Sequence, residues 1–190
     1  MKNRLRKICL TVCLGALAMS ALAVSAAAAE FRASQVKAVF LYNFAKFVEW
    51  PAEAFSTADA PLVLGILGPD PVGTAAMQSL ADKKLNGRPL EVRLLSSIEG
   101  AKGCHILFIS AAEQSRLARL LDSLRGSSIL TVSDIKRFAE QGGSIGLTTV
   151  EQKIRFEINV EAAREAGLVV SSQLLTLATA IHRSSRKDKP

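Results

Sequence analysis

Residues Ser34 to Pro51, SQVKAVFLYNFAKFVEWP, carry the strongest helical pattern of the chain. Apolar side chains recur there at intervals of three and four residues, the spacing of one face of an α-helix. That face comprises Val36, Val39, Phe40, Phe44, Phe47 and Val48. Ser34 is expected to cap the N-terminus of the helix, and Pro51 cannot continue it. The stretch therefore predicts an amphipathic helix packed on a core.

Asn43 lies within this apolar face. A buried amide without partners costs about 1–3 kcal/mol. We therefore expect Asn43 to have a structural role, with its side chain bonded to the backbone of a neighbouring element.

The first 29 residues have the pattern of a secretory signal peptide. A basic segment (1–7) precedes an apolar stretch (8–24) and the small residues Ser25 to Ala29. Cleavage is expected between Ala29 and Glu30, which would leave a periplasmic chain of residues 30–190. An uncleaved membrane anchor is the alternative, because the apolar stretch is just long enough to span a bilayer.

Charge and cysteine content narrow the possible functions. Removing residues 1–29 removes four of the 24 Lys and Arg residues and none of the 17 Asp and Glu residues, which lowers the net charge from +7 to +3. Nucleic-acid binding is therefore not expected. The basic tail, residues 183–190, is either a flexible solvated terminus or an arm that lies against anionic lipid. Cys104 alone would remain, either as a buried structural thiol or in an intermolecular disulfide.

The remaining chain alternates strand and helix patterns, which predicts one α/β domain with an open, mostly parallel sheet flanked by helices. Continuous apolar runs at 61–67, 105–110 and 129–132 predict buried strands. Residues 90–94 predict a half-exposed strand. Helices are expected near 74–84, 117–124, 135–141 and 161–166. Another helix should follow Ser171 or Ser172, with Leu174, Leu175, Ala178 and Ile181 facing inward.

Two strands, 144–149 and 153–160, predict an antiparallel hairpin near the C-terminal edge, with its turn around Glu151 and Gln152. Alternation places Ile154, Phe156, Ile158 and Val160 on one face. The opposite face, with Arg155, Glu157 and Asn159, is either a solvated charge ladder or, together with the turn at Thr149 to Gln152, a surface that contacts a protein partner. For Glu49 and Trp50 the two interpretations are packing within the domain and anchoring of a protein interface.

No coherent catalytic or metal-binding set is found. Gly142 to Gly146 matches Gly-x-Ser-x-Gly around Ser144, but the predicted order, a turn followed by a strand, is not that of a nucleophile elbow. His182 lies near the basic tail with no expected acid partner, and His105 should be structural. Gly68, Asp70 and Gly73 follow the first buried strand, where open α/β sheets bind ligands. They form either a simple turn or a small-ligand crevice.

The run Lys37 to Pro51 resembles the opening signature of the YfiR-like family of bacterial periplasmic proteins. Further similar blocks follow in the same order: residues 85–90, 104–110, 130–134, 142–146, 154–159 and 171–175. The resemblance implies a non-enzymatic regulator, without a cofactor, that represses an inner-membrane diguanylate cyclase and so lowers cyclic di-GMP and biofilm formation. It also implies a homodimer and an outer-membrane lipoprotein that sequesters the regulator. The alternative is a periplasmic small-molecule sensing module coupled to another receptor, such as a sensor kinase.

Overall fold

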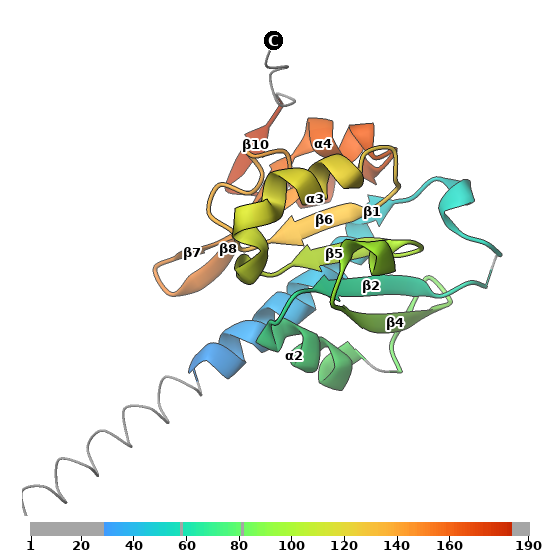
Figure 1. The fold of residues 1–190 in the computed structure, drawn as a ribbon, viewed down its shortest axis with the longest axis horizontal. Helices are drawn as coiled ribbons and strands as arrows, with labels where there is room; N and C mark the ends of the chain where they lie inside the picture. Colours follow the sequence, from blue (N-terminus) through green and yellow to red (C-terminus); the bar gives the residue numbers. More distant parts are fainter. Residues whose placement is uncertain (1–28, 58, 81, 184–190) are drawn as a thin grey trace, which may run out of the picture.

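The computed structural model describes residues 29–57, 59–80 and 82–183 (Figure 1). Its main sheet has eight strands in the order β10-β8-β7-β6-β5-β2-β4-β3. Two strand pairs, β7–β8 and β3–β4, are antiparallel, and the others are parallel. A second, two-stranded sheet pairs β1 with β9. The predicted single α/β domain with a mostly parallel sheet is confirmed, whereas the expected signal peptide and most of the basic tail lie outside the described residues.

The strands are β1 (Val48–Glu49), β2 (Leu62–Leu67), β3 (Lys84–Leu85), β4 (Arg88–Leu95), β5 (Ile106–Ile109), β6 (Leu130–Ser133), β7 (Ile145–Val150), β8 (Lys153–Asn159), β9 (Val169–Val170) and β10 (Ala180–His182). The N-terminal helix is described over residues 29–47. The other helices are α2 (Pro71–Leu80), α3 (Leu117–Ser123), α4 (Val160–Glu165) and α5 (Ser172–Leu177), with 3-10 turns η1 (Ala52–Ala54), η2 (Ile98–Ala101) and η3 (Ala111–Arg116).

The two faces of the main sheet bury separate cores. On the first face, the N-terminal helix and α2 pack against alternate residues of the strands, such as Phe108 and Ile158. On the second face, α3 and the segment 135–138 cover Leu107 and Ile109. Figure 1 shows α3 in front of the sheet and the N-terminal helix, in blue, behind it. Because helices cover both faces, β2, β5 and β6 are buried along their whole length.

The N-terminal helix differs from the expectation in which face it buries. Val36 and Val39 are 44% and 48% exposed, whereas the buried face consists of Ser34, Ala38, Leu41, Phe44 and Ala45. Ser34 lies inside the helix, where its hydroxyl donates to the Glu30 carbonyl, so it is not the N-cap. The helix ends at residue 47, and Val48 begins β1. Small alanines on the buried face allow the helix backbone to approach the sheet closely.

The segment 135–141 is not the predicted helix but a series of turns. Arg137 has a φ of +59°, in the left-handed region that does not propagate a right-handed helix. Phe138, 1% exposed, instead packs its ring against Gly143. A large aromatic side chain thus anchors an irregular segment over the second face of the sheet.

The C-terminal helix is also shorter than predicted. Ser171 caps α5 by accepting from the Leu174 amide, but the helix ends at Leu177. Residues Ala180–His182 then form β10, parallel to β8. Ile181 consequently does not face inward from a helix but is 40% exposed on a strand. The hairpin lies near this edge of the sheet, as predicted, with β10 as the one strand outside it.

Candidate partner-binding site

The β7–β8 hairpin projects beyond the body of the domain (Figure 1). Its strands pair from Ile145 opposite Ile158 to Val150 opposite Lys153. Only Glu151 and Gln152 connect them, with φ angles of +48° and +61°. Two consecutive left-handed residues are typical of the type I′ turn, which matches the twist of paired strands. The hairpin and its turn therefore lie where the sequence predicted them.

Side-chain alternation along β8 follows the expected pattern, with Phe156 and Ile158 buried in the first core. Arg155 is exposed, but the expectation of an exposed Asn159 is wrong, because this residue is only 1% exposed. Its Oδ1 accepts from the Ala162 amide at 2.9 Å and its Nδ2 donates to the Ala139 carbonyl at 2.8 Å. Asn159 thus caps α4 and holds the irregular segment, so it is not available to a partner.

The Glu157 side chain is half-buried and contacts a residue of β10. His182 Nε2 lies 3.0 Å from the Glu157 carboxylate, across the parallel pair β8–β10. The expectation that His182 has no acid partner is therefore wrong. The sequence pattern does not indicate this contact, because it predicts a helix through residues 180–182, where the structure has β10.

A groove of about 400 Å³ separates the hairpin from the segment 135–140. Polar and charged side chains line much of it, among them Thr148, Thr149, Glu157, Lys136, Arg137 and Glu140. Arg137 and Glu140 form an exposed ion pair across one turn. The groove places the predicted residue Glu157 beside charged residues that were not singled out from the sequence.

An ion pair between Lys37 and Asp134 lies at the end of this groove and ties the N-terminal helix to the end of β6. Both side chains are largely shielded, at 18% and 23% exposure. The second carboxylate oxygen of Asp134 is buried, with no hydrogen-bond partner among the described residues. Burial raises the pKa of nearby Asp70, an effect opposed by the charge of Lys37. Lys37 is therefore the cation that compensates these carboxylates.

Replacing Lys37 by Met should lower the free energy of unfolding by about 1–3 kcal/mol, because the Asp134 carboxylate would lose its compensating charge. The measurement is chemical denaturation of the purified protein. Asp134→Asn and the double variant complete a mutant cycle. We expect the double variant to lose less stability than the two single losses together; strict additivity would contradict the interaction.

Trp50 lies at the amino end of the parallel strands, opposite to the end from which the hairpin turn projects, and Glu49 belongs to the separate β1–β9 sheet. The Trp50 indole donates to the His105 carbonyl at 3.2 Å, just before β5 begins, whereas the hairpin turn follows the end of β7. Trp50 is half-buried, which favours packing over an interface anchor. Glu49 is exposed opposite Val169 in the β1–β9 pair. The structure therefore does not bring these two residues together with Arg155 and Glu157.

The predicted crevice around Gly68 is occupied by the chain itself. A Cβ on Gly68 would lie 2.7 Å from a carboxylate oxygen of the buried Glu113, and one on Gly73 would lie 2.6 Å from the Leu94 side chain. Asp70 Oδ1 accepts from the Val72 amide at the start of α2. These contacts favour a close-packed turn over an open ligand crevice.

The remaining candidate residues are placed as follows. Cys104 is free and buried, and burial raises the pKa of its thiol. Asn43 is half-buried, and its side chain has no hydrogen bond to the described residues. Ser144 is 3% exposed and precedes a strand, which is not the geometry of a nucleophile elbow. The described residues contain no group of three or more His, Cys, Asp or Glu that could hold a metal.

None of the helices in the described ranges has the length and apolar composition needed to cross a bilayer. A solved structure of a conserved domain protein from Vibrio cholerae O1 biovar El Tor strain N16961 aligns with a TM-score of 0.46 and 11% identity, over 63% of this chain and 54% of that one. The model of the YfiR/HmsC-like family matches residues 34–179. The chain therefore belongs to the YfiR/HmsC-like family.

Proposed function

We propose that this chain is a periplasmic regulator that binds the periplasmic part of an inner-membrane signalling protein and represses a diguanylate cyclase. Family membership over residues 34–179 is the observation that carries the proposal, because it is consistent with a regulatory, non-catalytic protein. A repressor of this kind needs no catalytic group. It requires only a higher affinity for the inactive state of its target than for the active one.

The projecting hairpin is the proposed contact surface. Arg155 and the tip residues Val150 to Lys153 are exposed, and Val150 presents an apolar side chain at 49% exposure. An exposed apolar residue among charged neighbours is a common composition for an interface. The proposal keeps Arg155 and the turn expected from the sequence and removes the buried Asn159 from the surface.

The turn itself supports a role for the tip. Glu151 and Gln152 adopt left-handed backbone angles that cost roughly 1 kcal/mol each for residues other than glycine. Asn-Gly would satisfy the same turn with less strain. Strained residues that persist on a surface are candidates for function.

The turn also permits a test that separates function from folding. We expect cyclic di-GMP to rise severalfold when the gene is deleted and to return to normal with the wild-type gene. Glu151→Asn/Gln152→Gly, combined with Arg155→Ala, should fail to restore the low level. The Asn-Gly turn should keep or raise the melting temperature of the purified variant, so misfolding would not explain the failure.

Thr176→Ala, an exposed substitution on α5, is the matched control and should complement fully. If the turn variant represses as well as wild type, the hairpin is not the contact surface. An unchanged cyclic di-GMP level in the deletion strain would overturn repression of a diguanylate cyclase altogether.

A further inference from the structure

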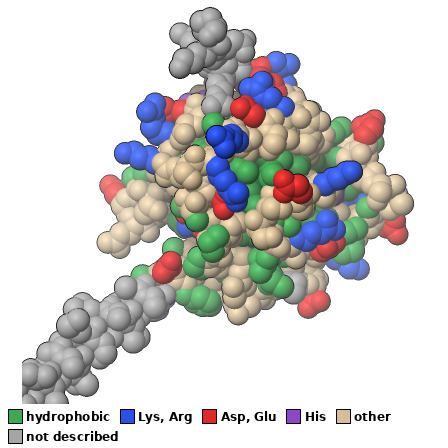
Figure 2. Space-filling view, in the orientation of Figure 1, with side chains coloured by type: hydrophobic (Ala, Val, Ile, Leu, Met, Phe, Trp, Pro, Cys, Tyr) green, Lys and Arg blue, Asp and Glu red, His purple; other side chains and the backbone are tan. Residues whose placement is uncertain are grey.

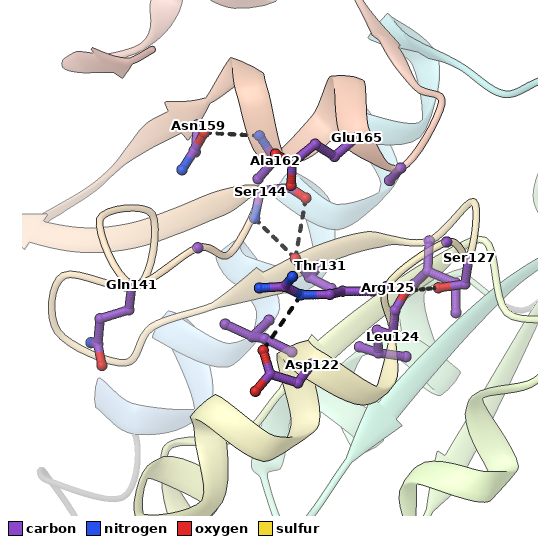
Figure 3. Close-up of a pocket in the computed structure, with 15 residues that line it drawn as sticks. Asp122, Leu124, Arg125, Ser127, Thr131, Gln141, Ser144, Asn159, Ala162 and Glu165 are labelled. Atoms are coloured by element: carbon purple, nitrogen blue, oxygen red, sulfur yellow. Dashed lines mark hydrogen bonds and ion pairs between the residues drawn. The ribbon is translucent and has the colours of Figure 1, made fainter. Parts of the chain in front are cut away.

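A second cavity, of about 200 Å³, lies between the end of α3 and α4, on the second face of the sheet (Figure 3). Its floor is formed where β6, the start of β7 and the end of β8 lie side by side. Figure 3 shows Thr131 and Ser144 at its centre, with Asp122 and Arg125 from the α3 side and Glu165 from α4. The hairpin groove is lined by different residues.

The floor carries a buried pair of hydroxyl groups. Thr131 and Ser144 are 6% and 3% exposed, and their oxygens lie 3.1 Å apart. Thr131 Oγ1 also accepts from the Ser144 amide at 2.9 Å. One hydroxyl must donate to the other, so the second hydroxyl hydrogen has no acceptor within the pair. A buried donor of this kind is costly unless something in the cavity accepts its hydrogen bond.

The other buried polar residues of this face are already satisfied. Ser133 donates to the Ile109 carbonyl and accepts from the Ile135 amide, and Asn159 uses both ends of its amide. These residues hold the irregular segment that covers the sheet. The spare hydrogen of the Thr131–Ser144 pair has no such structural use.

The walls and mouth restrict what could accept that hydrogen bond. Leu121, Leu124, Ile129, Ala162 and Ala166 provide apolar walls. At the mouth, Arg125 lies 3.5 Å from Asp122, and both are more than half exposed. Glu165 adds a second carboxylate, so the mouth carries two negative charges and one positive charge. An anion is therefore disfavoured, and the neutral floor offers nothing to compensate a buried ion.

We propose that this cavity binds a small neutral molecule with an apolar body about the size of a six-membered ring and one hydroxyl or carbonyl oxygen. An apolar cavity of roughly 150 Å³ is large enough for benzene, so the ring fits by volume. The oxygen accepts from the spare hydroxyl of the Thr131–Ser144 pair, and the ring packs against the leucines and alanines of the walls. This site does not depend on the proposed regulatory function.

Phenol, toluene and benzoate are matched probes, since they share a ring and differ in polarity and charge. We expect phenol, at concentrations up to about 10 mM, to shift the amide NMR signals of Thr131 and Ser144 in the purified protein as the cell produces it. Toluene should bind about fivefold more weakly, the loss expected for one hydrogen bond. Benzoate should not bind. Absence of phenol binding, equal affinity for toluene, or binding of benzoate would overturn the proposal.

Two variants test the location of the site. Ala162→Leu fills the cavity from α4 and should weaken phenol binding at least about tenfold. Thr131→Val/Ser144→Ala removes both hydroxyls and should reduce the preference for phenol over toluene to near one. Thr176→Val, on exposed α5, is the control and should leave both affinities unchanged. Phenol binding that survives Ala162→Leu in a folded protein would place the ligand elsewhere and contradict the assignment.

Discussion

Replacing His105 by Ala is expected to lower the free energy of unfolding by roughly 3–5 kcal/mol, one of the largest losses from any single substitution in this chain. His105 is 4% exposed. Its Nδ1 accepts from the Val63 amide at 3.0 Å, and its Nε2 lies 3.1 Å from the Ala54 carbonyl, to which it must donate. Truncation would leave the buried Val63 amide without a partner and would remove the donor to the half-buried Ala54 carbonyl.

The His105 ring is also the centre of an aromatic stack. Phe55 packs flat against it at 4.3 Å between ring centroids, and the Arg88 guanidinium lies 3.9 Å over the Phe55 ring. Arg88 in turn donates to the carbonyls of Thr57 and Ala60. Through Ala54, Phe55 and Arg88, the imidazole therefore holds the described part of the segment between β1 and β2, and its loss should loosen that part as well as destabilise the fold.

The pH dependence of the free energy of unfolding provides a second test of the structural role of His105. Burial lowers the pKa of His105 below its ordinary value of 6.5, an effect opposed by the hydrogen bond to Ala54. In the unfolded chain the His105 imidazole therefore takes up a proton near pH 6.5. In the folded chain the same imidazole stays neutral down to a lower pH. This contribution to stability is complete above about pH 6.5 and is lost as the pH falls from there toward the lowered pKa of the folded state.

Urea denaturation at several pH values between about 5.5 and 7.5 would measure this effect. The glutamine side chain of His105→Gln cannot titrate, although it retains a hydrogen-bond donor and an acceptor. The stability of this variant should therefore lack the decrease at low pH that protonation of His105 causes in the wild type. The two proteins differ only at position 105, so the difference between their curves isolates the effect of this imidazole. A wild-type curve parallel to that of the variant, or a loss below about 1 kcal/mol for His105→Ala, would contradict the structural role of the imidazole.

The second large effect is expected for Gly143→Ala, which should destabilise the fold by about 2–3 kcal/mol. A Cβ at this position would lie 2.0 Å from Cε1 of Phe138 and 2.4 Å from two further ring atoms. Phe138 is buried in the second core, so its ring has little room to move. The loss should appear as a lower midpoint in thermal or chemical denaturation.

Gly146→Ala is the matched control, because a Cβ there approaches the Ala139 nitrogen only to 3.3 Å. We expect a clearly smaller loss for it. In a Phe138→Leu background, the smaller side chain should relieve the clash and reduce the cost of Gly143→Ala. Equal losses for the two glycine variants, or no relief by Phe138→Leu, would show that the ring contact is not the cause.

Sequence patterns predicted the architecture well where the local signal and the tertiary environment agree. Continuous apolar runs identified β2, β5 and β6, which are buried on both faces, and alternation around Phe156 identified the hairpin. The hydrophobic pattern did not predict the correct element where a segment is too short to distinguish the helical period from the strand period. Short segments such as 180–182 fit a helix and a strand equally well, and only pairing with β8 decides between them.

The orientation of the N-terminal helix could not be derived from apolar side chains alone. Ala38 and Ala45 contribute little to a hydrophobic pattern, yet they lie on the buried face because small residues allow close packing. The spacing of the larger apolar residues instead predicted that Val36 and Val39 face the core. The sequence thus identified the helix but not the direction in which it faces.

For the candidate site, the sequence located the hairpin and its turn but not the contacts across strands. Glu157 with His182 and Lys37 with Asp134 join elements that are distant along the chain. One local signal was available: Thr131 and Ser133 interrupt an otherwise apolar buried strand, which indicates that this face of the sheet carries polar contacts.

The pairing of the first described elements with the last ones has a consequence for how the protein folds. Lys37 meets Asp134, 97 positions away, and Val48 pairs with Val170. A chain synthesised amino end first cannot complete these contacts until nearly all of it has emerged from the ribosome. Such a topology has a high contact order, and closing long loops slows folding. The N-terminal helix should therefore dock late and remain accessible to chaperones until the rest of the chain has folded.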